Sequence, residues 1–307
     1  MGSKLSKISG LLIALGASPG AFGLELPLAA DSHVVGEPRV LVARYEDTFV
    51  SIARAHDLGF EELVQANPGV DPWLPGEGTE IHLPTVFVLP HAPREGIVIN
   101  LPELRLYYFP AGDSGRVITH PISIGRMDWG TPLGLTSVQS KVVNPSWYPP
   151  QSIREEHAAD NRPLPQVVPP GPDNPLGSYA MRLGIPGYLI HGTNKPAGVG
   201  MRVTHGCIRM FPEDIEALFE TVPIGTPVRI VNQPFKLGRN GQGYYLEAHP
   251  PLAEGLEDEA SKMTELTRAF VAATEEGLGN EFSWEIAERI ASRSLGIPEF
   301  ISSAGLP

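Results

Sequence analysis

Ile190-His191-Gly192-Thr193-Asn194 and, after a glycine-rich spacer, Thr204-His205-Gly206-Cys207-Ile208-Arg209 are the stretch that decides the fold. Cys207 is the only cysteine in the 307 residues, so the chain offers it no disulfide partner. A thiol attacks as the thiolate, and a nearby imidazole is the common means of forming one near neutral pH. The apolar run before His191 predicts a strand that ends there, and Cys207 is expected on a turn that faces it.

This spacing alone leaves alternatives open. Gly206 permits a tight turn whose N–H groups would bind an oxyanion. Cys207 would otherwise be a buried structural residue. A third reading takes His191, His205 and Cys207 as zinc ligands, although His-x-Cys is a poor tetrahedral arrangement and no second cysteine accompanies it. We expect no metal and no cofactor.

The composition restricts the class of protein. The apolar fraction of 42% is that of a globular chain, and the net charge of -12 gives no electrostatic basis for a nucleic-acid partner. The 32 prolines and 33 glycines favour short strands and loops over long helices.

The N-terminus has the pattern of a secretory signal peptide, residues 1–23. Lys4 and Lys7 precede an apolar run, and Ala21 and Gly23 are small residues suited to cleavage after Gly23. The run is too short to span a bilayer, and no other stretch is long enough, so no membrane span is expected in the mature chain. A buried N-terminal helix is the alternative.

Residues 24–39 are expected to form a linker. Residues 40–84 then predict a strand, two helices and a last strand, with Asp47 or Thr48 at the first helix start and Pro68 ending the second. This segment resembles a lysin motif (LysM), a module that binds peptidoglycan glycan, although Glu46 stands where the motif usually has Gly. A LysM retained only as a spacer is the alternative.

Residues 96–232 are expected to be mainly β. Strands are predicted at 97–101, 104–109, 116–119, 138–143 and 228–231, with one helix at 212–219, which favours a sandwich or barrel beside a helix. The proline-rich stretch 149–175 predicts a loop or flap over one end. Apolar residues recur at helical spacing in 233–307, so an α-helical C-terminal extension is expected.

The quoted stretch, with Gly200-Met201-Arg202-Val203 before Thr204 and Asp214 after it, resembles the signature of the L,D-transpeptidase (YkuD-type) catalytic domain. The match covers 96–232. The similarity is greatest to the periplasmic proteobacterial branch, in which a LysM precedes the catalytic domain. It implies a mainly β fold with a β-sandwich catalytic domain and a periplasmic location after export.

The resemblance also assigns roles. Cys207 would be the nucleophile, His191 the general base, and the Gly192 carbonyl would orient the imidazole. Backbone N–H groups around Gly206 would hold the oxyanion. His205, Arg209, Asn194 and Thr204 would line the substrate site, with Arg209 meeting a carboxylate. Arg209 pairing with Asp214, and His205 or Thr204 serving only the turn, are the alternatives.

The implied reaction cleaves the diaminopimelate–D-Ala bond of a peptidoglycan stem tetrapeptide through a thioester. The acyl group then passes to an amine, either the C-terminal lysine of an outer-membrane lipoprotein or diaminopimelate of a second stem. Transfer to water would make the protein an L,D-carboxypeptidase. A non-catalytic wall-binding protein is the remaining alternative.

Overall fold

The computed structural model describes residues 23–126, 129–252, 259–275, 277–278 and 282–302. The expected signal peptide lies outside the described residues, apart from Gly23. None of the described helices is long and apolar enough to cross a membrane.

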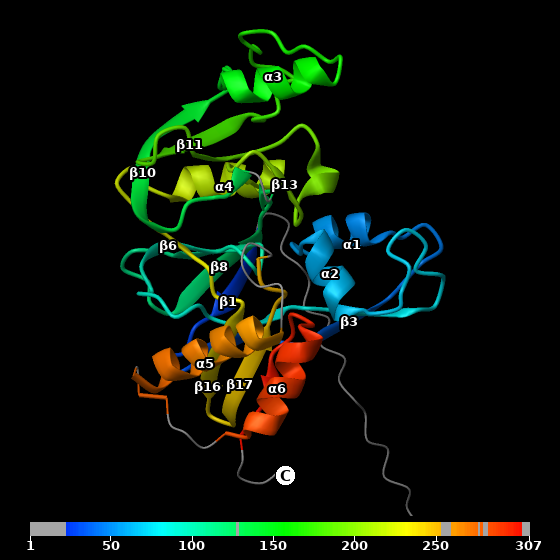
Figure 1. Ribbon diagram of the computed structural model, residues 1–307, viewed down its shortest axis with the longest axis vertical. Coiled ribbons are helices and arrows are strands. Elements are labelled where there is room, and N and C mark those ends of the chain that lie inside the picture. The colour runs from blue at the N-terminus through cyan, green and yellow to red at the C-terminus, as the bar shows by residue number, and fades with distance from the viewer. Residues whose placement is uncertain (1–22, 127–128, 253–258, 276, 279–281, 303–307) are drawn as a thin grey trace, which may run out of the picture.

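The centre of the molecule is a curled nine-stranded sheet (Figure 1) with the order β1-β8-β7-β6-β15-β10-β11-β12-β14. Its strands are β1 (Leu24–Pro27), β6 (Gly96–Asn100), β7 (Arg105–Phe109), β8 (Arg116–Pro121), β10 (Gly134–Val143), β11 (Tyr179–Leu183), β12 (Leu189–His191), β14 (Ile208–Arg209) and β15 (Pro227–Val231). The pairs β6–β15 and β12–β14 are parallel, and the other neighbours are antiparallel. The mainly β prediction is confirmed, but one curled sheet replaces the two sheets of the expected sandwich. Beside it lie the two-stranded pair β9 (Ile124–Gly125) and β13 (Arg202–Thr204), and the short 3-10 helix η2 (Pro196–Gly198).

The half of the sheet around β6 is buried on both faces. Side chains alternate along a strand, so Ile97 and Ile99 face one core while Val98 faces another. The first core is closed by α4 (Pro212–Thr221), the helix predicted at 212–219, through residues such as Ile215. Pro212 in its first turn and acids nearby suit the helix N-terminus.

The second core is shared with residues 40–84, which contain β3 (Arg39–Val42), α1 (Phe49–Ala55), α2 (Phe60–Ala66) and β4 (Glu80–Leu83) in the expected order. Thr48 caps α1. Phe49 and Leu63 of this βααβ unit join Val98 and Tyr107 of the sheet in one apolar cluster. The βααβ unit therefore packs directly on the central sheet. Figure 1 shows it in blue and cyan, to the right of the sheet.

Residues 24–39 correct the linker prediction. Leu24–Pro27 add β1 to the edge of the sheet beside β8, and β2 (Val34–Gly36) pairs with β5 (Val86–Val88). The reason is apolar burial: Leu26 and Val35 both belong to the core shared with the βααβ unit.

The C-terminal extension is not purely helical, which corrects that prediction. The helices α5 (Glu259–Glu275) and α6 (Trp284–Arg293) pack on a three-stranded sheet of β16 (Phe235–Asn240), β17 (Gly243–Ala248) and β18 (Glu299–Phe300). Ser283 caps α6, as the sequence predicts. Buried polar groups join this part to the rest: Lys236 Nζ lies 2.7 Å from Glu103 Oε1 and 3.0 Å from Glu247 Oε1.

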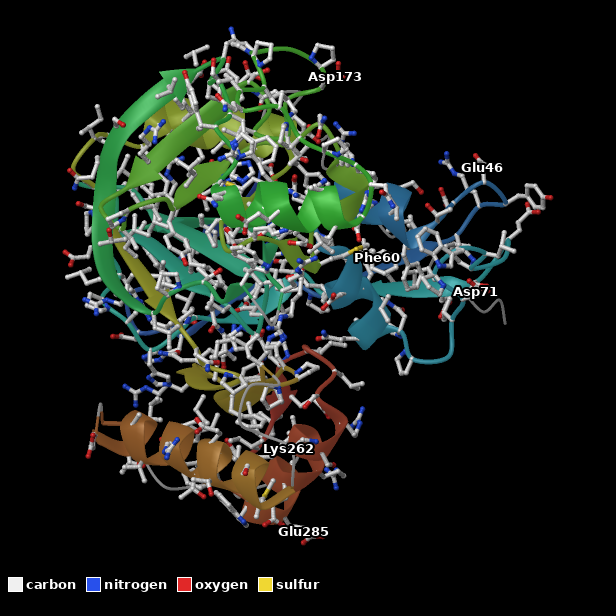
Figure 2. The ribbon with its side chains drawn as sticks, turned by 45° about the horizontal axis from the view of Figure 1, so that its top comes forward. Glu46, Phe60, Asp71, Asp173, Lys262 and Glu285 are labelled. Carbon is white, nitrogen blue, oxygen red and sulfur yellow. The ribbon has the colours of Figure 1, made fainter. Side chains whose placement is uncertain are left out.

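The proline-rich stretch 149–175 contains a helix that was not predicted, α3 (Gln151–Ala159). Ile153 is its only buried residue, so it carries too little apolar periodicity to be recognised as a helix. In Figure 1, α3 stands above the β10–β11 end of the sheet, and in Figure 2 Asp173 lies at the outer edge of the loop that follows it.

Candidate active site

His191 and Cys207 are brought together by two adjacent strands. β12 and β14 pair in parallel, with His191 opposite Arg209 and Ile190 opposite Ile208. Cys207 therefore lies beside Leu189, and alternation turns Cys207, Arg209, Leu189 and His191 to one side of the sheet. All four line a single cavity of about 680 Å³. The predicted strand-end histidine and turn-borne cysteine thus share one site.

The His191 ring is oriented by a backbone carbonyl. Its Nδ1 lies 2.6 Å from the oxygen of Gly192, so Nδ1–H donates there, which favours the tautomer with the proton on Nδ1. The ring also makes a backbone hydrogen bond to Leu176. Gly192 is buried, and a Cβ on it would lie 3.1 Å from Cγ2 of Ile215, so a side chain would press on α4. Burial, assisted by the positive charge of Arg209, lowers the pKa of His191 to about 4.

The surroundings of Cys207 favour the protonated form of its thiol. Burial raises its pKa, against a hydrogen bond from the Leu189 backbone and the charge of Arg209. The sulfur also lies 3.6 Å from the Gly187 carbonyl oxygen. A neutral imidazole and a neutral thiol lining one cavity suit a reaction in which proton transfer accompanies nucleophilic attack.

The turn before Cys207 requires glycine. Gly206 has φ +100, and a Cβ there would meet Cε1 of Tyr188 at 3.0 Å. Thr131 Oγ1 donates to the Gly206 carbonyl at 2.8 Å, and Thr204 Oγ1 donates to the Cys207 carbonyl at 2.7 Å. The Thr204 hydroxyl therefore supports the turn, and Thr204 also lines the cavity, as expected of a residue of the substrate site.

Arg209 is the cation of the cavity. No ion pair of Arg209 occurs among the residues that the structure describes, and its Nε is buried without a hydrogen-bond partner. The alternative pairing with Asp214 is wrong, because Asp214 faces His120 at 3.3 Å. A half-buried guanidinium without a counter-ion, beside the thiol, suits a substrate carboxylate.

His205 and Asn194 line the cavity as predicted, but each is also tied to the proline-rich stretch. His205 Nε2 donates to Oε2 of Glu156 on α3 at 3.1 Å, and its ring meets Trp129 edge-on at 5.1 Å. Asn194 Nδ2 donates to the Pro172 carbonyl at 3.1 Å. Glu156 was missed in the sequence because nothing in its local pattern points to a partner 49 residues away.

Aromatic and apolar side chains from the proline-rich stretch and the two residues before it complete the cavity wall, which the sequence did not identify. They are Trp147, Tyr148, Ile153, Leu164 and Val168. The predicted flap therefore covers the site on one side.

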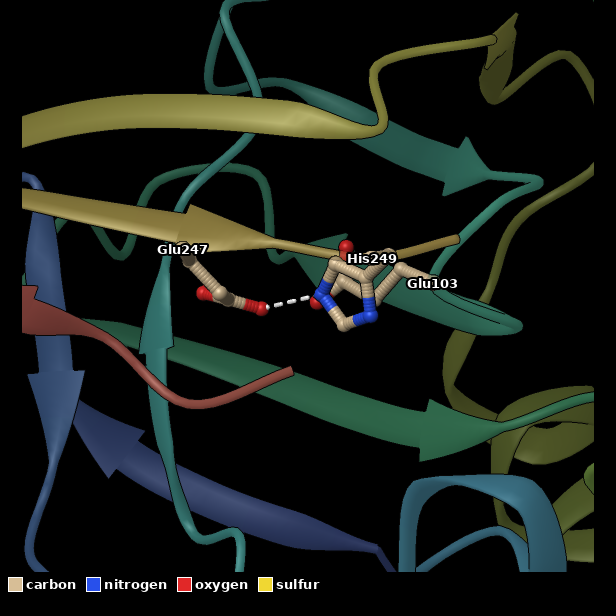
Figure 3. A group of neighbouring side chains, drawn as sticks. All are labelled: Glu103, Glu247 and His249. Carbon is tan, nitrogen blue, oxygen red and sulfur yellow. Dashed lines mark hydrogen bonds and ion pairs between the residues drawn. The ribbon is translucent and has the colours of Figure 1, made fainter. Parts of the chain in front are cut away.

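A metal-type cluster lies elsewhere. Within the described ranges, Glu103, Glu247 and His249 are the one group whose ligand atoms converge (Figure 3), with His249 Nε2 2.6 Å from Glu247 Oε1. Lys236 already supplies the cation between the two carboxylates. The zinc alternative at His191, His205 and Cys207 is not met, because these three do not converge within ligand distance.

Comparisons with known proteins identify the family of the chain. The YkuD family, the L,D-transpeptidase catalytic domain, matches residues 94–230. The probable L,D-transpeptidase YcfS of Escherichia coli (strain K12) is 46% identical over 236 residues, covering 75% of this chain and 73% of that protein. YbiS of the same strain, also a probable L,D-transpeptidase, is 42% identical over 76% of this chain and 77% of its own. The probable L,D-transpeptidase ErfK/SrfK of Salmonella typhimurium is 38% identical and covers 94% of both chains. This chain therefore belongs to the YkuD-type L,D-transpeptidase family and is an L,D-transpeptidase enzyme.

Proposed function

We propose that the enzyme acts on peptidoglycan, with Cys207 as nucleophile and His191 as general base. The observation that carries the proposal is the 2.6 Å contact between His191 Nδ1 and the Gly192 carbonyl, in the cavity that also holds Cys207. This contact fixes the tautomer that leaves Nε2 as the proton acceptor. The Gly192 carbonyl then takes the place of the carboxylate in a catalytic triad.

The chemistry follows in two steps. Nε2 of His191 takes the thiol proton as sulfur attacks the diaminopimelate carbonyl, and backbone N–H groups of the Gly206–Cys207 turn bind the oxyanion. The C–N bond breaks, His191 returns the proton to the amine of D-Ala, and a thioester remains. An amine then attacks the thioester, His191 takes its proton, and the thiol is regenerated.

Arg209 supports the choice of donor. Its guanidinium lies in the cavity with no counter-ion among the described residues, so it binds a carboxylate of the stem peptide. His205 and Asn194 hold the peptide against the flap through contacts in the same cavity. The acceptor is an amine, supplied by the lysine of a lipoprotein C-terminus or by diaminopimelate of a second stem.

The βααβ unit is proposed to be a LysM that binds the glycan strand. Two exposed aromatic side chains support this: Tyr45 is 84% exposed and Trp73 58%. Aromatic rings commonly provide such ligand contacts. Figure 2 shows Glu46 and Asp71 at the outer end of this unit, whereas Phe60 lies where it meets the catalytic part. The chain would reach its substrate by export to the periplasm, directed by a leader that is then cleaved.

Mass analysis of muropeptides tests the proposal. Purified sacculi are incubated with the enzyme, with and without a peptide ending in the lipoprotein lysine. We expect loss of tetrapeptides and gain of 3→3 dimers or peptide-linked stems, with no change for Cys207→Ala. Tripeptides as the sole product would identify an L,D-carboxypeptidase, and unchanged sacculi would refute the catalytic proposal. The proposed glycan binding by the βααβ unit needs its own test. Deleting residues 40–84 would disturb the core that this unit shares with the sheet. Substitutions of the exposed Tyr45 and Trp73 are therefore used instead, and binding to sacculi is measured.

A further inference from the structure

A second cluster of titratable side chains lies where α4, β8 and the α1–α2 connection meet, and it takes no part in the proposed reaction. Asp214, in the first turn of α4, is fully buried, and so is His120 at the end of β8. Asp57 joins them from the α1–α2 connection, where its backbone has a positive φ of 53. Burial and the charge of Asp214 raise the pKa of Asp57 to about 6, so the two carboxylates lie close enough to repel each other.

Two basic side chains lie near the cluster but leave Asp214 without a donor. Arg105 binds both oxygens of Glu62 through Nε and Nη2 at 2.6 and 2.7 Å, and Nη2 also donates to the Asp57 backbone carbonyl at 3.1 Å. Among the described residues no group donates a hydrogen bond to either carboxylate oxygen of Asp214. His120 Nδ1 lies 3.3 Å from Asp214 without hydrogen-bond geometry. An unbonded buried carboxylate is costly, so the site is built for a positively charged donor.

The start of the described chain lies at this cluster. Gly23 is buried, its N–H donates a hydrogen bond to Asp57, and the next residue begins β1. Leu24 pairs with Thr119, the residue before His120. A Cβ on Gly23 would lie 2.4 Å from Cε1 of His120, so the slot beside the imidazole admits a small group only. Cleavage after Gly23 would leave an ammonium on Leu24, one residue from this slot.

We propose that the α-ammonium of the mature chain binds the Asp57–Asp214 pair and completes this buried cluster. The inference rests on the export included in the proposed function. Hydrolysis of the leader adds water across an amide bond, which leaves a carboxylate on the leader and an ammonium on the enzyme. That ammonium carries three N–H donors and one positive charge, so it supplies the hydrogen-bond donor that Asp214 lacks. Leader removal thereby locks β1 onto the sheet edge.

Amine reactivity tests the proposal directly. The mature chain is prepared in two ways, by export and by specific proteolysis of a fusion protein. Both preparations begin at Leu24, and the second makes the test independent of export. An aldehyde that modifies unprotonated α-amines is added at pH 8, and mass spectrometry follows the modification of residue 24. A Leu-Glu-Leu-Pro peptide gives the rate of an exposed amine. We expect the enzyme to react about fivefold more slowly at this pH, because ion pairing raises the pKa of the amine by about one unit.

Variants assign the protection to the cluster. Asp57→Asn and Asp214→Asn are expected to restore the peptide's rate, whereas Asp113→Asn, an exposed aspartate that pairs with Arg116, leaves the protection intact. Cys207→Ala must also retain it, which separates this proposal from the catalytic one. A second measurement needs no substitution in the core. A chain with Gly-Ser added before Leu24 has no ammonium at residue 24, so we expect it to melt at a lower temperature than the mature chain.

Three results would overturn the proposal. The first is a wild-type amine that reacts at the rate of the peptide. The second is an extended chain as stable as the mature one. The third is an exported protein whose first residue is not Leu24.

Discussion

Replacing Glu62 with glutamine removes the charge that fastens the βααβ unit to the sheet. The Glu62 carboxylate binds Arg105 at 2.6 and 2.7 Å and also accepts the Gly59 N–H at 2.5 Å. The Arg105 side chain is 0% exposed and the Glu62 side chain 6% exposed, so the pair is shielded from water. Breaking a buried ion pair from one side costs about 3–5 kcal/mol, because the remaining charge stays buried without its partner.

This loss is large for a domain whose whole stability is about 5–15 kcal/mol. We expect Glu62→Gln to lower the free energy of unfolding by about 3–5 kcal/mol, measured by urea denaturation. The effect should extend to the active site, because Gly59 lies against Gly200 of the loop between His191 and Cys207, and the N–H of Glu61 donates to the Gly200 carbonyl at 3.2 Å. Transpeptidase activity should therefore fall at temperatures where the protein remains folded.

Two controls make the test specific. Glu25→Gln breaks the exposed pair with Arg116 and should cost less than about 1 kcal/mol, since surface ion pairs contribute little. Glu62→Gln combined with Arg105→Met should destabilise less than the sum of the two single changes, because the second removes the orphaned charge. A Glu62→Gln protein as stable as Glu25→Gln would refute the reasoning, as would a βααβ unit that unfolds separately.

Three further predictions concern the site. Gly206→Ala should lower kcat by about 100-fold, as loss of an oxyanion donor does, because its Cβ would meet Tyr188 at 3.0 Å and shift the turn; unchanged steady-state kinetics would contradict this. Arg209→Lys should lower kcat/KM by about 10- to 100-fold with folding intact, since an ammonium cannot make the paired hydrogen bonds of a guanidinium; equal kcat/KM on donors with and without the carboxylate would argue against this role. The pH profile of kcat/KM should rise through about 4, where His191 becomes neutral, and fall only above the usual thiol range, since burial raises the pKa of Cys207; an acid limb near 6.5 would contradict the buried neutral imidazole.

The residues that could be predicted from the sequence are those whose partners are near in the chain. His191 and Gly192 are adjacent, and the turn to Cys207 is closed by Thr204, so a short motif contains the geometry. The strands of the sheet and α4 could also be predicted, because their apolar periodicity and turn residues are local signals.

The remainder depended on contacts between distant segments. Glu62 and Arg105 are 43 residues apart, and Glu156 reaches His205 from an unrecognised helix. β1 is a strand only because the edge of β8 is open beside it, so its four residues read as a linker. Polar residues have no periodicity that predicts a partner, which is why buried pairs are seen only once the fold is known.

The central claim is that Cys207 is the nucleophile and is activated by His191. A carbapenem tests it, because its strained cyclic amide carbonyl acylates a reactive thiol and the adduct is stable enough to weigh. Intact mass spectrometry after incubation at pH 7 should show one carbapenem per wild-type chain, no adduct on Cys207→Ala and much slower acylation of His191→Gln. Wild-type protein that stays unmodified between pH 5 and 9, or an equal adduct on Cys207→Ala, would contradict the account.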